Sequence, residues 1–325
     1  MVESELLADN PLGDPHRRPL YVYVPEGVEK SSACPSIYMI QGFTGQLDMW
    51  EDRNPFEPNM IERLDVLFAD PSVPRAIVVF VDAWTKFGGS QFINSSSTGP
   101  YMDYLCDEIP AFVDGIYPTI ADPAHRGLTG KSSGGYGAMV VAMKRSDVFN
   151  GLASHAGDAL FESCYAATFR EAVRDLRDNF DGSPEVFWKR VEAAERFSFD
   201  EFGKFFEIYG YAVCYTPDPD HPGKALLPFD VETGRLIDDV WAKWLEWDPV
   251  RMIPKHVDDL RKMKLIYLDA GRSDEWYLDL GAQAVSKELT KLEIEHTLDL
   301  FPGKHGGIQY RYPKAIKALA EALAD

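Results

Sequence analysis

Cysteine is scarce in this chain of 325 residues: the four present, Cys34, Cys106, Cys164 and Cys214, lie far apart and form no CxxC pair. This spacing provides neither a metal-type ligand set nor a disulfide framework, so we expect free thiols in a reducing compartment, no metal and no cofactor. Apolar runs near the ~20 residues that span a bilayer are missing too. The first residues lack a basic region followed by an apolar stretch, which predicts a cytoplasmic protein unless a signal has been removed ahead of this N-terminus.

Basic residues are in deficit. The sequence has 33 lysines and arginines against 52 aspartates and glutamates, a formal net charge of −19 at pH 7. Such a surface repels phosphate backbones and anionic lipids, so neither nucleic acid nor a membrane surface is an expected partner. A small molecule is the expected ligand, and the oligomeric state stays open, with a homodimer among the possibilities.

Short apolar runs alternate along the chain with helical patterns, which is typical of a mainly parallel sheet flanked by helices. The runs are rich in β-branched and aromatic residues and are bounded by glycine or proline. We expect an α/β fold with strands at 19–25, 35–41, 76–83, 126–130, 151–157, 264–271 and 296–303.

One region breaks this alternation. Between about 160 and 255 the pattern contains helical segments and a Pro/Asp-rich loop but no convincing strand, and the stretch 197–215 has eight aromatic residues among 19. We interpret the chain as one α/β-hydrolase-type domain, 1–325, with a lid-like helical insertion over the sheet. Part of 197–215 is expected to cover the substrate pocket.

The stretch "RGLTGKSSGGYGA", 126–138, contains the pattern G-x-S-x-G between a strand and a helix. A strand-to-helix turn this tight forces strained backbone angles on its central serine and leaves no room for side chains two residues away. Gly130 and Gly134 meet that demand around Ser132. For Ser133 the residue two positions earlier is Lys131, which is too large. The pattern therefore predicts Ser132 as a nucleophile.

A serine nucleophile needs a general base, and in this chain order the base follows the serine. Of the later histidines, His221 lies in the Pro/Asp loop, His256 at a charged helix start and His296 at a strand edge. His305, in "LFPGKHGGIQY", follows the last expected strand in a glycine-bounded loop, from which a side chain can reach over the sheet. We expect His305 to be the base.

The sequence pattern offers several candidates for the carboxylate that orients the histidine. "LIYLDAGRSDEWY" offers Asp269, Asp274 and Glu275, and Asp158 follows the preceding strand. Asp274 is favoured because its strand is expected to neighbour the strand of His305, although it could also cap the following helix. Asp158 could instead cap the first helix of the insertion.

An oxyanion needs two preorganised N–H donors. The amide of Ser133, directly after the nucleophile, is one. The second is expected from "GFTG" after the strand 35–41, with Phe43 as the donor and Thr44 as the next choice.

Taken together, "GKSSGGYGA", "YVYVPEG…PSIYMIQGFTG", "GRSDE" and "FPGKHGG" resemble the esterase D group of α/β-hydrolases, which includes S-formylglutathione hydrolases, feruloyl and acetylxylan-type esterases and mycolyltransferase relatives. The resemblance runs from about residue 18 onward, the insertion excepted. It implies a triad of Ser132, Asp274 and His305 with Phe43 and Ser133 as oxyanion donors. Many members have His-Gly where this chain has Gln41-Gly42, and His and Met are frequent where it has Lys131 and Ser133.

The expected activity is hydrolysis of carboxylic esters through an acyl-enzyme, with feruloyl, acetyl or other small acyl groups as substrates. Acyl transfer to an alcohol and hydrolysis of the thioester S-formylglutathione are the alternatives, and a non-catalytic binding protein on the same scaffold is a third class. The candidate substrate-binding residues are Gln41, Thr44, Lys131, Asn94 and Asp158.

Overall fold

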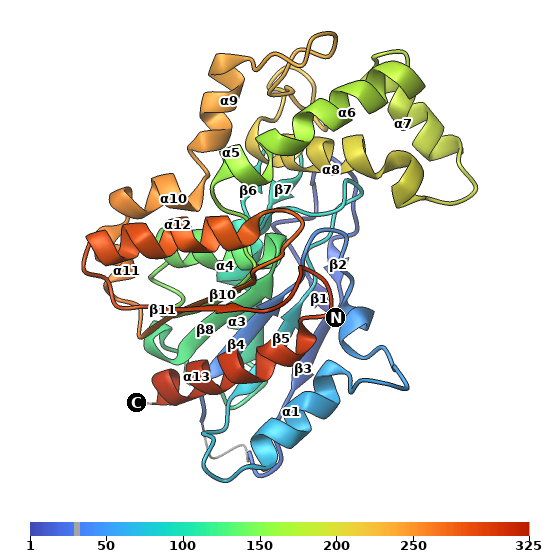
Figure 1. Ribbon diagram of the computed structural model, residues 1–325. Helices are drawn as coiled ribbons and strands as arrows, with labels where there is room; N and C mark the ends of the chain where they lie inside the picture. The colour runs from blue at the N-terminus through green and yellow to red at the C-terminus, as the bar shows by residue number, and fades with distance from the viewer. Residues whose placement is uncertain (29–32, 325) are drawn as a thin grey trace.

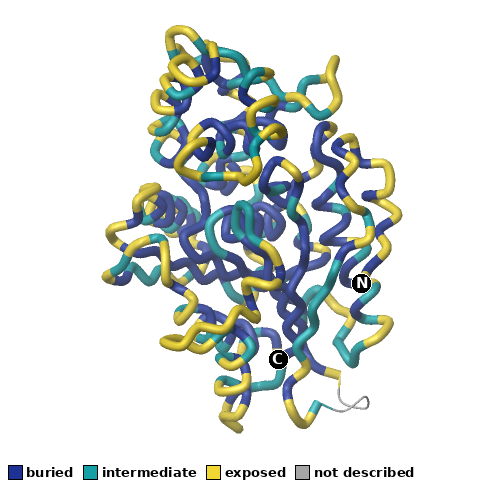
Figure 2. The backbone as a smooth tube through the Cα atoms, turned by 90° about the vertical axis from the view of Figure 1, so that its right-hand side faces the viewer, coloured by how far each residue is buried: buried dark blue, intermediate teal, exposed yellow. Residues whose placement is uncertain are grey.

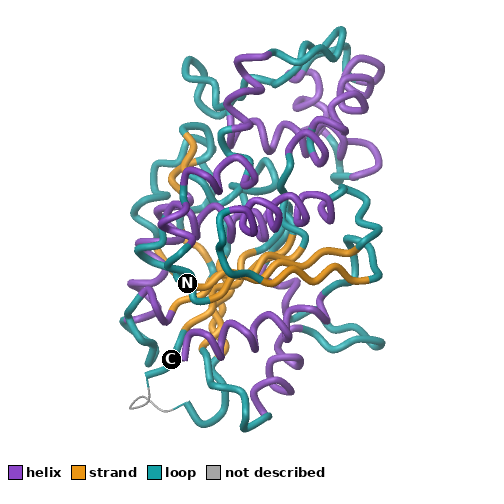
Figure 3. Tube along the Cα trace, turned by 60° about the vertical axis from the view of Figure 1, so that its left-hand side comes forward, coloured by secondary structure: helices purple, strands orange, loops and turns teal. Residues whose placement is uncertain are grey.

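The computed structural model describes residues 1–28 and 33–324. At its centre is a seven-stranded sheet with helices on both faces (Figures 1 and 3). The sheet strands are β3 (Leu20–Tyr23), β4 (Ser36–Ile40), β5 (Ile77–Val81), β8 (Arg126–Lys131), β9 (Gly151–His155), β10 (Leu265–Gly271) and β11 (Thr297–Phe301). All seven expected strands are confirmed, each within a few residues of its expected ends.

The order of the strands is β11-β10-β9-β8-β4-β5-β3, and only β3 runs antiparallel to its neighbour. The carboxyl ends of the six parallel strands therefore meet at one edge of the sheet, where open α/β folds place their ligands. Two small antiparallel pairs lie outside the sheet: β1 (Val2–Glu3) with β2 (Arg17–Arg18), and β6 (Asn94–Ser95) with β7 (Gly99–Pro100).

Alternate residues of the strands enter two separate cores. In β4, Ile37 and Met39 belong to a cluster with α1 (Met60–Ala69) and α13 (Tyr312–Ala324). Tyr38 and Ile40 belong to the larger cluster on the other face. Because side chains of a strand alternate between faces, one continuous apolar run supplies both layers. Figure 2 shows buried backbone, in dark blue, running through the centre of the molecule.

The larger core is covered by the helices α2 (Tyr101–Asp103), α3 (Ile109–Asp114), α4 (Ser133–Lys144) and α12 (Leu278–Lys291) and by the helices of the insertion. Short 3₁₀ or π segments occur at Leu47–Trp50, Tyr104–Glu108, Pro123–His125, Ile253–Lys255 and Gln309–Arg311. Among the described residues, no helix is both long and apolar enough to traverse a bilayer. All four cysteines are free thiols in the structure, and all four are buried.

Between β9 and β10 the described chain is helical, with only two isolated bridges of strand type. The helices are α5 (Phe161–Cys164), α6 (Ala166–Asn179), α7 (Pro184–Ala193), α8 (Phe199–Tyr215), α9 (Asp238–Leu245), α10 (Pro249–Met252) and α11 (Val257–Leu260). Helices α5 to α9 gather above the sheet in Figure 1. Aromatic residues of α8 pack against α7, in the pairs Phe205–Phe187 and Tyr209–Trp188, and α8 also lies against α6.

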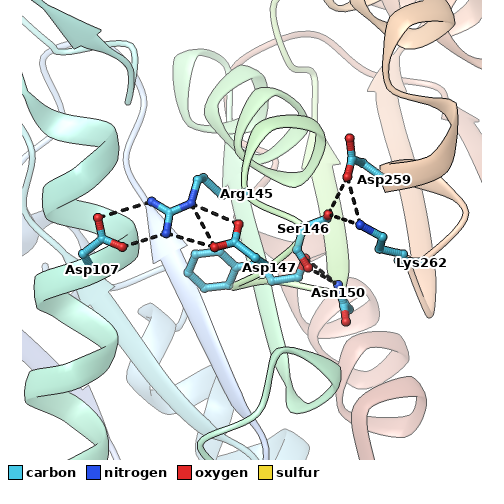
Figure 4. A network of polar contacts seen from close by, with 8 residues as sticks. Asp107, Arg145, Ser146, Asp147, Asn150, Asp259 and Lys262 are labelled. Atoms are coloured by element: carbon cyan, nitrogen blue, oxygen red, sulfur yellow. Dashed lines mark hydrogen bonds and ion pairs between the residues drawn. The ribbon is translucent and has the colours of Figure 1, made fainter.

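The far end of α4 is fixed by a polar network (Figure 4). Arg145 pairs with Asp107 at 2.6 Å and with Asp147 at 3.1 Å. Ser146 donates a hydrogen bond to Asp259 at 2.7 Å, and Lys262 pairs with the same carboxylate at 3.1 Å, as Figure 4 also shows. These contacts tie α4 to the π segment before α3 and to α11, so the helix that starts at the predicted nucleophile is anchored at its other end.

Candidate active site

The predicted nucleophile lies at a strained turn between β8 and α4. Ser132 has φ 58° and ψ −126°, in the left-handed half of backbone space that side-chain-bearing residues rarely adopt. Its N–H donates to the carbonyl of His155 at 2.9 Å, and its carbonyl accepts from the N–H of Tyr136 at 2.8 Å. The strain expected at a nucleophile position therefore falls on Ser132, and the surrounding backbone holds it there.

Glycine is required on both sides of this serine. A Cβ added to Gly130 would lie 2.6 Å from the carbonyl carbon of Gly134, and one added to Gly134 would lie 2.4 Å from the carbonyl oxygen of Ile40. Both obstacles are backbone atoms, which cannot move aside cheaply. The G-x-S-x-G spacing is thus required by the close contact between the turn and β4.

The expected base and acid meet above the last two strands. Asp274 follows β10, His305 follows β11, and these strands pair in parallel with Gly271 opposite Phe301. The Nδ1 atom of His305 lies 2.9 Å from Oδ2 of the buried Asp274 carboxylate. The other oxygen, Oδ1, accepts from the N–H of Trp276 at 2.9 Å, ahead of α12. One oxygen of Asp274 thus faces the histidine, and the other holds the turn ahead of α12, whose N-cap residue is Tyr277.

Neighbouring side chains fix the position of His305. Its backbone N–H donates to Glu275 Oε2 at 3.0 Å, and its ring packs against the ring of Trp276 with centroids 4.8 Å apart. Glu275, one of the alternative acids, thus contacts the backbone of the histidine and leaves the ring to Asp274. The hydrogen bond from the His305 N–H lowers the pKa of the Glu275 carboxyl.

Asp158 lies beneath the turn and has other partners. Its Oδ2 accepts from the Tyr165 hydroxyl at 2.7 Å and lies 3.4 Å from the hydroxyl of Ser133 and 3.5 Å from Nε2 of Gln91. Burial raises the pKa of this carboxyl above its ordinary value. Within the described residues, Asp158 makes no hydrogen bond to His305 and does not line the cavity at Ser132.

Asp269, the remaining alternative acid, belongs to a separate buried network. Its Oδ1 lies 2.8 Å from Nδ1 of His155, and its Oδ2 accepts from Nε of Arg311 at 3.1 Å. Both His155 and Asp269 are buried. The Asp269 carboxylate is thus occupied by His155 and Arg311 and makes no hydrogen bond to His305 among the described residues.

The loop after β4 lies directly against the nucleophile turn. A Cβ on Gly42 would lie 3.1 Å from the carbonyl oxygen of Lys131 and 3.5 Å from Cβ of Ser132. The N–H of Thr44 is already donated to the carbonyl of Gly88 at 2.9 Å. Among the described residues, the N–H groups of Phe43 and Ser133 have no backbone hydrogen-bond acceptor, and Ser133 is the first residue of α4.

A cavity of about 460 Å³ opens at Ser132 and His305. Its walls come from the loop after β4, the start of α8, and the loops that carry Trp276 and His305. The lining residues are Gly42, Phe43, Thr44, Gly45, Met49, Trp50, Lys131, Ser132, Phe199, Gly203, Lys204, Glu207, Trp276, His305, Gln309 and Tyr312. Of the candidate substrate-binding residues, Thr44 and Lys131 therefore lie at the cavity.

Gln41 and Asn94 are outside the lining of this cavity. With the Gln41 amide oriented to match its neighbours, the nitrogen donates to the carbonyl of Val81 at 2.5 Å and the oxygen accepts from the N–H of Ala83 at 2.8 Å. Gln41 therefore ties the loop after β4 to the end of β5. The Asn94 side-chain oxygen accepts from the N–H groups of Met102 and Asp103 at 3.0 and 3.2 Å. Asn94 thus holds the start of α2, outside the cavity lining.

Two charged groups of the cavity have displaced pKa values. Burial lowers the pKa of Lys131, against the opposing effect of nearby carboxylates. Burial also raises the pKa of Glu207 to about 7, although the Tyr211 hydroxyl opposes the shift. Glu207 and Trp276 were not identified from the sequence, because their approach to the cavity depends on how α8 and the loop before α12 fold back. No group of three or more His, Cys, Asp or Glu side chains in 1–28 and 33–324 is placed to hold a metal ion.

Comparison with known proteins agrees with the expected family. The chain is 24% identical to S-formylglutathione hydrolases of Mus musculus and Rattus norvegicus over 143 residues, which cover 42% of the chain. It spans half the length of these curated relatives. An S-formylglutathione hydrolase from Agrobacterium tumefaciens superposes with a TM-score of 0.61 at 15% identity, covering 99% of this chain and 93% of that one.

A ferulic acid esterase superposes with a TM-score of 0.59 at 16% identity, covering 94% of this chain and 92% of that one. At such identities these likenesses establish the α/β fold. The family model named Esterase, described as "Putative esterase", matches residues 15–312. The chain therefore belongs to the Esterase family.

Proposed function

We propose that the protein is a serine carboxylic-ester hydrolase that works through an acyl-enzyme formed on Ser132. The observation that carries this proposal is that the strained Ser132 and His305 line the same cavity. The Nδ1 atom of His305 lies 2.9 Å from the Asp274 carboxylate, which leaves Nε2 as the ring nitrogen for the serine. A nucleophile, a base and an orienting acid in this relation are the parts that acyl transfer requires.

In the proposed reaction, Ser132 Oγ attacks the ester carbonyl carbon while Nε2 of His305 accepts the hydroxyl proton. Asp274 accepts the hydrogen bond from Nδ1–H, which fixes the tautomer and stabilises the imidazolium. The N–H groups of Phe43 and Ser133 donate to the oxyanion. The C–O bond to the alcohol then breaks, and the alcohol leaves with the proton from His305.

Water completes the cycle by the same route. His305 removes a proton from the water, the hydroxide attacks the acyl carbon, and the carboxylic acid leaves as Ser132 regains its proton. Among the described residues Ser132 Oγ makes no hydrogen bond, and the proposed reaction requires one between Oγ and Nε2 of His305 in the substrate complex. Such contacts commonly tighten only in the substrate complex.

The proposed substrates are esters with small, acetyl or feruloyl-type acyl groups, because relatives in fold and sequence are named for ferulic acid and S-formylglutathione. Deacylation by an alcohol, giving transfer, uses the same residues and is distinguished by product analysis with added acceptor alcohols. In this proposal the chain is one α/β-hydrolase domain, and the helices between about 160 and 255 cover the pocket as a lid, since α8 supplies Phe199, Gly203 and Lys204 to it.

The test is labelling by a serine-directed phosphonate, followed by peptide mapping and a panel of short-chain, feruloyl, acetyl-sugar and S-formylglutathione substrates. We expect one adduct on Ser132, and Ser132→Ala should lose ~10⁶-fold in kcat by analogy with serine proteases. Ser133→Ala is the matched variant because it removes the neighbouring hydroxyl and keeps the amide. An adduct on Ser133, or full activity in Ser132→Ala, would overturn the proposal.

A further inference from the structure

A carboxylate that takes no part in the proposed reaction reaches the catalytic cavity from the insertion. Glu207 lies on α8, and its half-buried side chain lines the same cavity as Ser132 and His305. Burying a carboxylate, even in part, is costly unless it is hydrogen-bonded. The hydrogen-bond partners of the Glu207 carboxylate therefore indicate whether it serves the fold alone or is available to a ligand.

Only one of its two oxygens is used by the protein. Oε1 accepts from the Tyr211 hydroxyl at 2.9 Å. The described residues place no ion pair on Oε2 and no hydrogen bond to it within 3.5 Å, although the nearby Trp276 side chain also lowers the pKa of this carboxyl. Lys204, one turn earlier on α8, lies 3.8 Å from Glu171 instead. Glu207 thus presents an unused acceptor at the cavity.

The position of this acceptor is fixed by packing. The ring of Tyr211 lies 5.1 Å from that of Phe43, the proposed oxyanion residue, and 4.7 Å from that of Tyr165. The Tyr165 hydroxyl in turn donates to the buried Asp158 at 2.7 Å. This packing fixes the position of Glu207 relative to the oxyanion loop, and a residue that determines substrate specificity needs such a fixed position.

The rest of the lining indicates what Glu207 can bind. Phe199 and Trp276 are 53% and 40% exposed, which is unusual for such large apolar side chains and offers ring faces to a ligand. Lys131 and Lys204 place positive charge in the same cavity. A cationic ligand would meet these lysines and an anionic ligand would meet Glu207, whereas a hydroxyl can donate to a carboxylate and accept from an ammonium.

We propose that Glu207 accepts a hydrogen bond from a hydroxyl group of the ester and thereby makes the enzyme select hydroxylated esters. This inference rests on the proposed function at Ser132. The raised pKa of Glu207, near 7, agrees with it, because the ionised carboxylate is short of hydrogen bonds that a substrate hydroxyl would supply. Glu207 is a specificity residue here, and the reacting atoms remain those of Ser132 and His305.

The hydroxyl can belong to either arm of the ester, and matched substrates distinguish the two. For the acyl arm, methyl 3-(4-hydroxyphenyl)propenoate is compared with methyl 3-phenylpropenoate. For the alcohol arm, glyceryl monoacetate is compared with propyl acetate. The measured quantity is the ratio of kcat/KM within each pair, which cancels general losses of activity.

We expect wild type to prefer the hydroxylated member of one pair by about 10- to 100-fold, as one hydrogen bond to a charged group allows. Glu207→Met should abolish that preference, and Glu207→Gln should restore part of it because an amide oxygen still accepts. Glu201→Gln, on the exposed first turn of the same helix, is the matched control and should keep the wild-type ratio. Tyr211→Phe, which frees Glu207 from its support, should weaken the preference.

The inference is wrong if wild type shows no preference in either pair, or if Glu207→Met keeps the wild-type ratio. Should Glu207→Met fail to fold, the ratios of Glu207→Gln and Tyr211→Phe decide, and unchanged ratios in both contradict it. Ser132→Ala separates this failure from that of the proposed function. If all activity depends on Ser132 and only the ratios are unchanged, then the role of Glu207 alone is refuted.

Discussion

Two histidine–aspartate pairs lie in or next to neighbouring strands of this sheet. Their hydrogen-bond distances are nearly the same, but their surroundings differ. His305 and Asp274 are joined at 2.9 Å, and His155 and Asp269 at 2.8 Å. The first pair stands in loops beyond β10 and β11. The second lies within β9 and β10 themselves, where His155 and Asp269 are register partners.

Their surroundings assign them opposite roles. His305 reaches the cavity at Ser132, whereas His155 is fully buried, its Nε2 has no partner within the described residues, and its ring lies 4.4 Å from that of Tyr312. The inner pair still serves the site, because the carbonyl of His155 accepts the N–H of Ser132. A histidine beside a carboxylate thus becomes a base only where its second nitrogen can reach a reacting group.

The largest expected difference between the pairs is in rate. Asp274→Asn should lower kcat by about 10⁴-fold with the fold retained, because the amide favours the wrong tautomer of His305. Steady-state kinetics together with thermal unfolding measure this. Asp158→Asn, an equally buried change beneath the turn, should cost far less. A larger loss in Asp158→Asn would assign the third triad position to Asp158.

The inner pair should act on stability. Asp269→Asn removes the charge between His155 and Arg311 and should lower the free energy of unfolding by about 3 to 5 kcal/mol, as expected when one partner of a buried pair is lost. Its kcat should fall by less than tenfold where the protein is folded. Denaturant unfolding tests this, with the exposed Asp258→Asn as control. If Asp269→Asn lowered kcat as much as Asp274→Asn does, the inner pair would have a catalytic role as well, contrary to this prediction.

The accessible pair works only beside a correctly formed turn. Gly134→Ala places a methyl group 2.4 Å from the carbonyl oxygen of Ile40 and should cost about 1 to 3 kcal/mol of stability by overpacking. Gly306→Ala, whose Cβ would meet nothing within 4 Å, should leave stability within about 0.5 kcal/mol. Equal stability of the two variants in urea titration would contradict the close contact between the turn and β4.

Glu207 extends the comparison to a carboxylate that, among the described residues, is paired with neither a histidine nor a lysine or arginine. Because folding raises its pKa to about 7, the protein loses stability as pH rises from about 4.5 to 7 and bears the full cost above pH 7. Glu207→Gln should therefore be more stable than wild type by about 1 to 2 kcal/mol at pH 8 and gain nothing at pH 4. Melting curves from pH 4 to 8 measure the stability of Glu207→Gln relative to wild type, with Glu201→Gln as the control. A stability difference that does not change with pH would show that the raised pKa of Glu207 is not its cause.

The sequence predicts the frame of the site better than its lining. The strands could be located because their β-branched runs are buried on both faces, and the Ser132 turn because only glycine fits on either side of it. The choice of Asp274 depended on β10 and β11 being neighbours, which two consecutive strands in a chain commonly are. These features are local, or nearly so.

The errors and omissions lie where tertiary contacts decide. Gln41 is adjacent in sequence to the oxyanion loop, yet it faces β5, and Asn94 serves α2. Glu207 enters the cavity from a helix more than 70 residues beyond Ser132. No period or spacing in the sequence encodes that approach, because it depends on how α8 packs against α6 and α7.

The strand order also has a consequence for the time at which activity appears during synthesis. Ser132 leaves the ribosome 173 residues before His305, and chains begin to fold from the N-terminus as they emerge. The nucleophile turn between β4, β8 and α4 can form while β11, an edge strand, has yet to be made. A nascent chain therefore carries the serine without its base, and the fold withholds ester chemistry until its last strand is in place.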